Sequence, residues 1–121
     1  MAAPETSPFQ LSRAPSETEL LAKYFRALGD PTRLRVLGLL REGELSVGEI
    51  VERLRLPQPK VSNHLACLRW CGFVVGERQH RTVRYRLVDD RVTTAIDLAR
   101  SLLADNAEHV RACGLIDGGR C

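Results

Sequence analysis

Hydrophobic residues recur at helical spacing along most of the chain, and the clearest case is residues 57–72. Val61, Leu65 and Leu68 follow one another at intervals of four and three residues, which places them on a single apolar stripe. Gly72 then suits the left-handed conformation in which helices commonly end. The stretch predicts a helix that packs through this stripe and leaves the polar residues near its N-terminal end facing outward.

Three shorter helices are predicted before it, over residues 17–29, 31–41 and 47–54. Asp30 and Pro31 provide an N-cap and a first helical position for the second of these helices. Ser46 is followed three residues later by Glu49, which is the capping-box pattern that opens the third. Because only a short connection separates this third helix from residues 57–72, the two together predict a helix-turn-helix.

The hydrophobic pattern changes its period after Gly72. Residues 73–75 and 82–87 are rich in β-branched and aromatic side chains, and they predict two short strands around a polar tip at residues 76–81. Residues 89–113 return to helical spacing and predict a last helix that is long and apolar for the surface of so small a domain. We therefore expect a mainly α-helical fold with a small β-hairpin, a winged helix-turn-helix, that forms a homodimer through its terminal helices.

Length and composition agree with one domain. The chain has 121 residues, of which 27% are charged and only 5% aromatic, a balance that favours helices. Residues 1–16 contain several prolines and little periodicity, so we expect a flexible N-terminal arm there. The DNA-binding and dimerisation domain is expected over residues 17–113, and residues 114–121 form a C-terminal tail.

The chain lacks the apolar run of about 18 residues that a membrane helix requires, and its start lacks a signal pattern. We therefore expect a cytoplasmic protein with no membrane partner. Thiols are kept reduced in that compartment. Four cysteines consequently indicate metal or redox chemistry before structural disulfides.

The predicted helix-turn-helix places polar side chains where a reading helix meets double-stranded DNA. The N-terminal half of such a helix enters the major groove, and a basic hairpin behind it suits phosphates or a minor groove. The net charge of +3 is compatible with this partner without arguing for it. The alternative, a solvated charged loop, does not explain why the basic hairpin directly follows a helix-turn-helix. The candidate DNA-binding residues are Gln58, Lys60, Ser62, Asn63, His64, Arg78, Arg81 and Arg84.

The thiols form the second candidate site. Cys67 and Cys71 lie four residues apart, on one face of the predicted helix, with Cβ atoms about 5–6 Å apart. Thiolates at this spacing suit one soft metal ion, and a third ligand would come from Cys113, with Cys121 as a further candidate. Free cysteines also serve as ordinary small core residues, which is the competing interpretation.

The sequence shows no arrangement of nucleophile, base and orienting group, no glycine-rich phosphate loop and no paired acids. We therefore expect that the chain is not an enzyme and has no organic small-molecule substrate.

Several motifs resemble one family closely. Residues 27–37 read Ala-Leu-Gly-Asp-Pro-Thr-Arg-Leu-Arg-Val-Leu, residues 61–65 read Val-Ser-Asn-His-Leu, and residues 83–85 read Val-Arg-Tyr. With residues 44–50, these segments are similar in sequence and order to the ArsR/SmtB family of metal-sensing repressors. The resemblance implies a homodimeric winged-helix protein that sits on operator DNA and leaves it when metal binds.

Within that family the metal sites differ between branches. The arsenic-type site on the third helix needs cysteines where this chain has Ser46 and Gly48, and the zinc-type site on the last helix is incomplete around Asp97 and His109. Residues 63–72 instead resemble the CmtR-like branch, which senses cadmium and lead through two thiols on the reading helix and a third after the last helix. A related mercury-responsive repressor is also similar.

We therefore expect a repressor that binds operator DNA as a dimer and is released by a soft divalent metal ion, Cd, Pb or Hg, acting as effector. Cys67, Cys71 and Cys113 fit the three ligand positions that the resemblance implies. A thiol redox switch of the same fold is the alternative. A DNA-binding protein with inert cysteines is the third possibility that the sequence leaves open.

Overall fold

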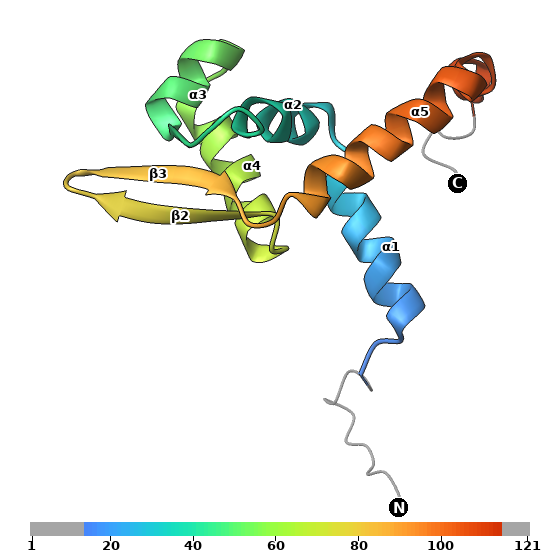
Figure 1. Ribbon diagram of the computed structural model, residues 1–121, viewed down its shortest axis with the longest axis horizontal. Helices are drawn as coiled ribbons and strands as arrows, with labels where there is room; N and C mark the ends of the chain where they lie inside the picture. The colour runs from blue at the N-terminus through green and yellow to red at the C-terminus, as the bar shows by residue number, and fades with distance from the viewer. Residues whose placement is uncertain (1–13, 115–121) are drawn as a thin grey trace, which may run out of the picture.

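The computed structural model describes residues 14–114, and over this range the chain forms five helices and three strands (Figure 1). In chain order these are α1 (Glu17–Leu28), α2 (Pro31–Leu40), β1 (Leu45–Ser46), α3 (Val47–Leu54), α4 (Gln58–Trp70), β2 (Val74–Gln79), β3 (Thr82–Leu87) and α5 (Arg91–Ala112). The predicted order of helices, helix-turn-helix, hairpin and final helix is confirmed.

Side-chain caps define where the helices begin. The Asp30 carboxylate accepts a hydrogen bond from the Arg33 N–H at 3.1 Å, directly before Pro31 starts α2. Ser46 and Glu49 form both hydrogen bonds of a capping box at the start of α3. Both caps were predicted from the sequence, so local chemistry sets these boundaries.

The turn of the helix-turn-helix follows α3. Arg55 adopts a left-handed conformation with φ of 57°, and Pro57 then leads into α4. A non-glycine residue in this region is destabilised by roughly 1–2 kcal/mol relative to the usual backbone. The packing of α3 against α4 must offset this backbone cost at Arg55.

The hairpin differs from the prediction in two respects. Strand β2 continues to Gln79, so the tip consists of His80 and Arg81 and not of residues 76–81. Strand β1 was not predicted, and it pairs antiparallel with β3 through Leu45 opposite Tyr85, which gives the sheet order β1-β3-β2. The wing is therefore tied to the start of α3.

The core lies between α2, α3, α4 and the base of the hairpin. The predicted stripe of α4 is buried, with Val61, Leu65 and Leu68 at most 1% exposed. Phe73 is the largest fully buried side chain, and its ring stacks against Tyr24 of α1 with centroids 4.3 Å apart. This core fixes α4 against the rest of the domain.

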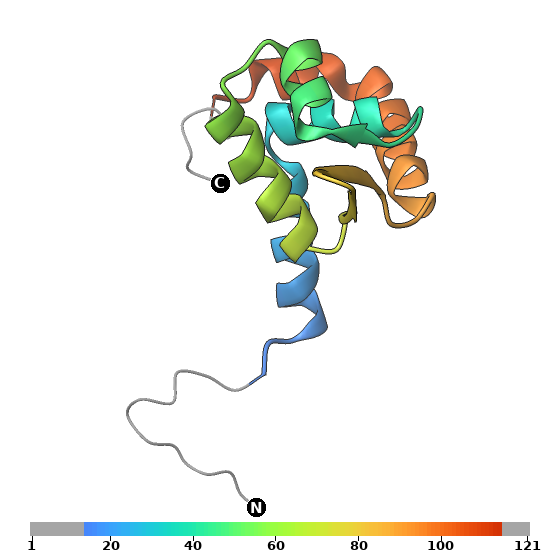
Figure 2. The ribbon, with the colours of Figure 1, turned by 90° about the vertical axis from the view of Figure 1, so that its left-hand side faces the viewer.

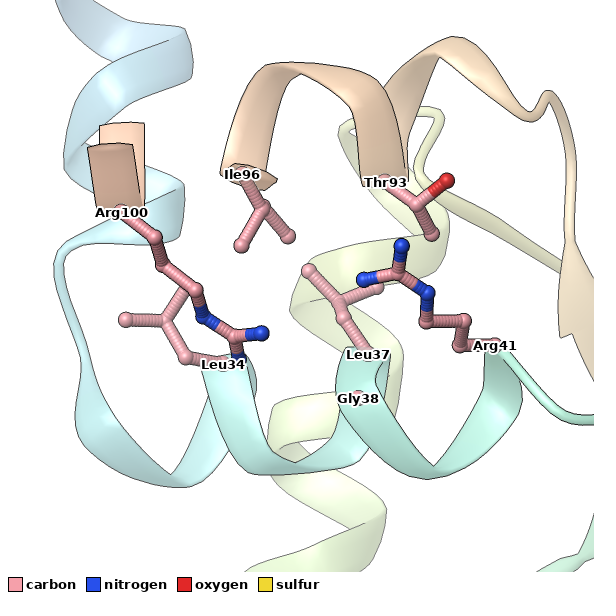
Figure 3. A pocket seen from close by; sticks show the side chains of 7 residues that line it. All are labelled: Leu34, Leu37, Gly38, Arg41, Thr93, Ile96 and Arg100. Carbon is pink, nitrogen blue, oxygen red and sulfur yellow. The ribbon is translucent and has the colours of Figure 1, made fainter. Parts of the chain in front are cut away.

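The two terminal helices extend away from this core, on the side opposite the wing (Figures 1 and 2). Thr93 and Ile96 of α5 face α2, and Arg41 Nη1 of α2 donates to Asp97 Oδ1 at 2.7 Å. Figure 3 shows the hollow between the two helices, with Arg41 and Ile96 at its edge. Its volume is about 10 Å³, which is at most the space of one water molecule.

Apolar side chains remain uncovered on both terminal helices within the single chain. Phe25 of α1 is 62% exposed and Leu98 of α5 is 63% exposed. Monomeric proteins rarely expose contiguous apolar surface of this kind. The other exposed apolar residues on these helices are Leu20, Leu21, Tyr24, Leu102, Leu103 and Val110.

The predicted arm at residues 1–16 and the predicted tail at residues 114–121 lie outside the described residues, apart from residues 14–16 and 114. Cys121 is outside them as well. In the described part of the chain, none of the helices has the length and apolar character to cross a membrane.

Candidate functional site

The outward face of α4 carries the predicted reading residues. Gln58, Lys60 and Asn63 are exposed, and Ser62 is half-buried. The helix contains no acidic residue between its first and last positions, and Arg69 adds a second cation near its C-terminal end. A helix with this composition is suited to approach phosphates and base edges without charge repulsion.

His64 is placed differently from its neighbours on α4. Its side chain is only 17% exposed, and its Nδ1 accepts a hydrogen bond from Arg33 Nε at 3.2 Å. The Asp30 carboxylate lies 3.9 Å from the same nitrogen. The imidazole therefore faces the start of α2 and is partly withdrawn from the outer face of α4.

The arginines of the wing fall into two groups. Arg78 and Arg81 are exposed at the end of the hairpin. Arg84 instead points to the base of the wing, where its Nε donates to Glu44 Oε1 at 2.9 Å and its Nη2 donates to the Glu44 carbonyl at 3.1 Å. A third contact joins its Nη1 to Glu49 Oε1 at 3.2 Å. Arg84 therefore connects the wing to the start of α3.

Cys67 lies on α4, and Cys71 is the C-cap residue one turn later, whose N–H donates to the Cys67 carbonyl at 3.0 Å. Both are half-buried and free, and Cys71 packs against the core. Partial burial raises the pKa of the Cys71 thiol and the adjacent Cys67 raises it further, while Lys23 and Arg33 act in the opposite direction. Cys67 and Cys71 therefore form a thiol pair with two cations nearby, and a metal ion would have to displace their protons.

Cys113 was predicted as the last residue of the final helix; it is the C-cap residue directly after α5 and is half-buried. Within residues 14–114 of a single chain, no three His, Cys, Asp or Glu side chains gather closely enough to hold a metal ion. The single chain therefore brings Cys67 and Cys71 together and does not add Cys113 to them.

Two features of the site were not predicted from the sequence. Arg33 of α2 donates hydrogen bonds to Ala27 of α1 and to His64 of α4. The sequence had shown it only as part of the motif at residues 27–37. Trp70, the only tryptophan, is 84% exposed at the end of α4, next to Cys71 and one turn after Cys67. Its position opposite the buried stripe was readable from helical spacing, whereas the partners of Arg33 depend on the packing of three helices.

Comparison with known proteins places this geometry in a family. Residues 30–75 match the family described as bacterial regulatory protein, arsR family. A probable mercury resistance operon repressor of Streptomyces lividans is 45% identical over 97 residues, which make up 80% of this chain and 78% of that protein. The chain belongs to the ArsR family. It is therefore a bacterial-type transcriptional regulator with a helix-turn-helix that binds DNA.

Other ArsR-family relatives agree with this assignment. The HTH-type transcriptional regulator CmtR of Mycobacterium tuberculosis is 45% identical over 85 residues, or 69% of this chain and 72% of CmtR. Among solved structures, the homodimeric winged helix-turn-helix DNA-binding domain Mb0332 of Mycobacterium bovis has a TM-score of 0.68 and 26% identity, covering 76% of this chain and 85% of that one. These ArsR-type proteins are regulators and not enzymes, and they confirm the predicted winged helix-turn-helix.

Proposed function

We propose that this ArsR-family protein is a homodimeric, cytoplasmic repressor that releases operator DNA when a soft divalent ion, Cd, Pb or Hg, binds to thiolates of Cys67, Cys71 and Cys113. The observation that carries the proposal is the pair of free, half-buried thiols in the last turn and at the C-cap of the reading helix. Any ion held there acts directly on the element that meets DNA. The mercury and CmtR regulators named above support a metal effector.

The dimer is supported by the uncovered apolar side chains of α1 and α5. A second copy that packed against Phe25 and Leu98 would remove this surface from water, with a gain of about 25 cal/mol for each Å² of apolar area. A dimer also suits DNA, because two reading helices related by two-fold symmetry meet half-sites about 34–36 Å apart. The homodimeric state of the Mycobacterium bovis neighbour is a further argument.

The position of Cys113 supports a metal site shared between subunits. It does not approach Cys67 and Cys71 within one chain, yet it ends the helix that the dimer would bury. Cys113 of one subunit is therefore proposed to complete the pair on the other subunit. Thiolates prefer soft ions, with bonds of about 2.3 Å to zinc and longer bonds to larger metals.

Repression and release follow from this placement. A metal that ties α4 of one subunit to α5 of the other changes the relative position of the two reading helices. Only a modest energy is required, because a 100-fold loss of operator affinity corresponds to about 2.7 kcal/mol of coupling. Lys60, Ser62, Asn63 and Gln58 of α4, with Arg78 and Arg81 of the wing, are the proposed contacts to DNA.

The experiment begins with an operator selected from random duplexes by the purified protein. Fluorescence anisotropy then measures the affinity of this duplex with and without Cd²⁺, Pb²⁺ and Hg²⁺, while a thiolate-to-metal charge-transfer band reports binding of the ion. The variants Cys67→Ser and Cys71→Ser should bind the duplex normally and fail to release it. Release by these variants at the metal concentrations that release the wild type would contradict the proposed site.

A mixture of variants tests whether the site is shared. Cys67→Ser and Cys113→Ser homodimers should each lack a complete site. Their heterodimer contains one complete site, formed by the thiol pair of one subunit and Cys113 of the other, and should bind one ion. Failure of the mixture to recover any charge-transfer band would rule out a site completed across the dimer. Cys121→Ser is the matched control for loss of a C-terminal thiol, and loss of release in that variant alone would move the third ligand to the tail.

Trp70 provides an internal reporter for the same titration. Trp70 is 84% exposed and directly precedes Cys71 in the chain, so a heavy ion bound to the thiol pair should quench its fluorescence. Thiol counting after peroxide treatment separates the redox alternative, because a switch of that kind would lose free thiols and release DNA without metal.

A further inference from the structure

Arg33 is the point at which three helices meet. It lies in the first turn of α2, where its N–H donates to Asp30. Its Nη1 donates to the carbonyl of Ala27 in the last turn of α1 at 2.9 Å. Its Nε donates to Nδ1 of His64 in the middle of α4 at 3.2 Å. One side chain therefore connects the helix with the exposed apolar face to the helix with the thiols and the reading residues.

The bond to Ala27 satisfies a group that α1 leaves without a partner. The last four carbonyls of an α-helix have no intrahelical donor. Ala27 is only 4% exposed, so water has little access to this one. The guanidinium supplies the missing donor from outside the helix. Loss of Arg33 would leave the end of α1 without this attachment.

The bond to His64 requires a particular form of the imidazole. Nδ1 accepts a hydrogen bond from Arg33 Nε, so it carries no proton itself, and in the neutral ring the proton sits on Nε2. The Asp30 carboxylate stands near both groups. Burial raises the pKa of Asp30, but the hydrogen bonds from the Arg33 and Thr32 backbone and the charge of Arg33 act against it, and the pKa is lowered. The cluster is thus built around an ionised Asp30 and a charged Arg33.

The two bonds depend on the planar fork of arginine. Nε and Nη1 point in fixed, different directions, so Arg33 can hold a carbonyl on α1 and a nitrogen on α4 at the same time. The single ammonium of a lysine has no such fixed geometry. The angle between α1 and α4 is therefore sensitive to this one side chain, and Cys67 lies only one turn beyond His64.

We propose that Arg33, acting through His64, is the positioning residue that sets the orientation of the reading helix α4 relative to α1. The same link transmits the metal response between α4 and the dimer interface at α1. The inference rests on the proposed function, because it names a residue through which that response passes. It also assigns His64 to the link with Arg33 in place of a direct DNA contact. Arg33 itself touches neither DNA nor metal.

The test compares Arg33→Lys, His64→Leu and the double variant with wild type. Operator affinity is measured by anisotropy with and without Cd²⁺, and Cd²⁺ affinity by the charge-transfer band. Arg33→Lys should weaken metal-free operator binding by about tenfold, the size of effect expected for one hydrogen bond to a charged group. The ratio of operator affinities without and with Cd²⁺ should fall by a similar factor, while Cd²⁺ affinity is retained. A purely structural role would lower the folded fraction without changing this ratio.

Three controls make the outcome decisive. The double variant should lose no more than the larger single loss, because both substitutions break one link, whereas separate DNA contacts would give losses that add. His64→Asn keeps an acceptor near the position of Nδ1 and should restore most of the response. Arg35→Lys, a conservative change at an exposed arginine on the same helix, should behave as wild type.

The inference is overturned if Arg33→Lys keeps the wild-type ratio, if the two losses add, or if the salt dependence of DNA binding falls as it would for a lost phosphate contact. If Arg33→Lys does not fold, His64→Leu decides the question, because it leaves the bond to Ala27 in place. If the wild type shows no response to any of the ions, the proposed function fails. The positioning role of Arg33 is then tested by metal-free operator affinity alone: Arg33→Lys should weaken it, and the losses in Arg33→Lys and His64→Leu should not add in the double variant.

Discussion

Arg84 and Arg81 lie on the same strand-and-tip segment of the wing, yet the structure gives them different tasks. Arg84 was predicted to bind DNA, but its guanidinium is directed to the side chain and carbonyl of Glu44, at 2.9 and 3.1 Å. Arg81 is exposed at the tip. We expect Arg84→Gln to alter the stability of the wing and Arg81→Gln to alter the attraction to phosphates.

The size of each effect follows from these contacts. Hydrogen bonds to charged groups contribute about 1.5–3 kcal/mol when buried, and the Arg84 and Glu44 side chains are 28% and 39% exposed, so solvent reduces the loss in Arg84→Gln to about 1–2 kcal/mol. At about 4–8 °C for each kcal/mol, Tm should fall by several degrees. Arg81→Gln should leave Tm unchanged. If each subunit of a dimer loses one phosphate contact, the slope of log affinity against log salt should become shallower by about 1.8.

The assay needs no knowledge of the operator, because the electrostatic part of binding is independent of sequence. Anisotropy of any labelled B-form duplex, measured from low to moderate salt, gives the slope for wild type and both variants, and thermal unfolding gives Tm. The two variants should separate cleanly, one changing Tm and the other changing the slope. A shallower slope with an unchanged Tm in Arg84→Gln would refute the assignment of Arg84 to the base of the wing.

Two further outcomes are expected from the core and from the root of α5. Phe73→Ala removes the largest fully buried side chain and should lower the free energy of unfolding, measured by urea denaturation, by about 3–5 kcal/mol. Phe73→Leu should lower it much less. Equal losses in the two variants would show that the site is not tightly packed. For Asp97, the hydrogen bond from Arg41 lowers the pKa of the carboxyl, so its stabilising effect is present above the unfolded pKa of about 3.9 and is lost as the pH falls through the lower folded pKa. Asp97→Asn should therefore melt below wild type at neutral pH and approach it in acid, and a difference that grows in acid would contradict this sign.

Much of the fold was accessible from the sequence because it is local. The buried stripe of α4, the Asp30 cap and the Ser46 capping box each depend on residues within a few positions of one another. Strand β1 was missed because two residues show no alternation, and it exists only through pairing with β3. The extent of β2 was underestimated because Gly76 reads as part of a turn. In the strand it leaves room for Tyr85, whose ring would lie 2.9 Å from an added Cβ.

The candidate site divides in the same way. The adjacency of Cys67 and Cys71 follows from helical spacing alone. His64 stands 31 residues from Arg33 and Glu44 stands 40 residues from Arg84, and no periodicity indicates these contacts. For Cys113, residues 14–114 of one chain do not supply neighbours that complete a metal site, and the ligands proposed to join it belong to a second subunit. Sequence patterns therefore indicated which side chains share a face of one helix, and they did not indicate which side chains join elements that are distant in the chain.

The attachment of α5 has a mechanical consequence. The helix contacts α2 in its first half, around Ile96 and Asp97, and then continues to Ala112. At 1.5 Å per residue the part of α5 from Asp97 to Ala112 is about 22 Å long. A tilt of about 5° at Asp97 therefore moves the C-terminal end of the helix by about 2 Å. The helix can thus rotate as a rigid rod about the Arg41–Asp97 ion pair. A shift of about 2 Å at the C-terminal end of α5 therefore corresponds to a rotation of only about 5° at its start, where the helix meets the domain that contains α4.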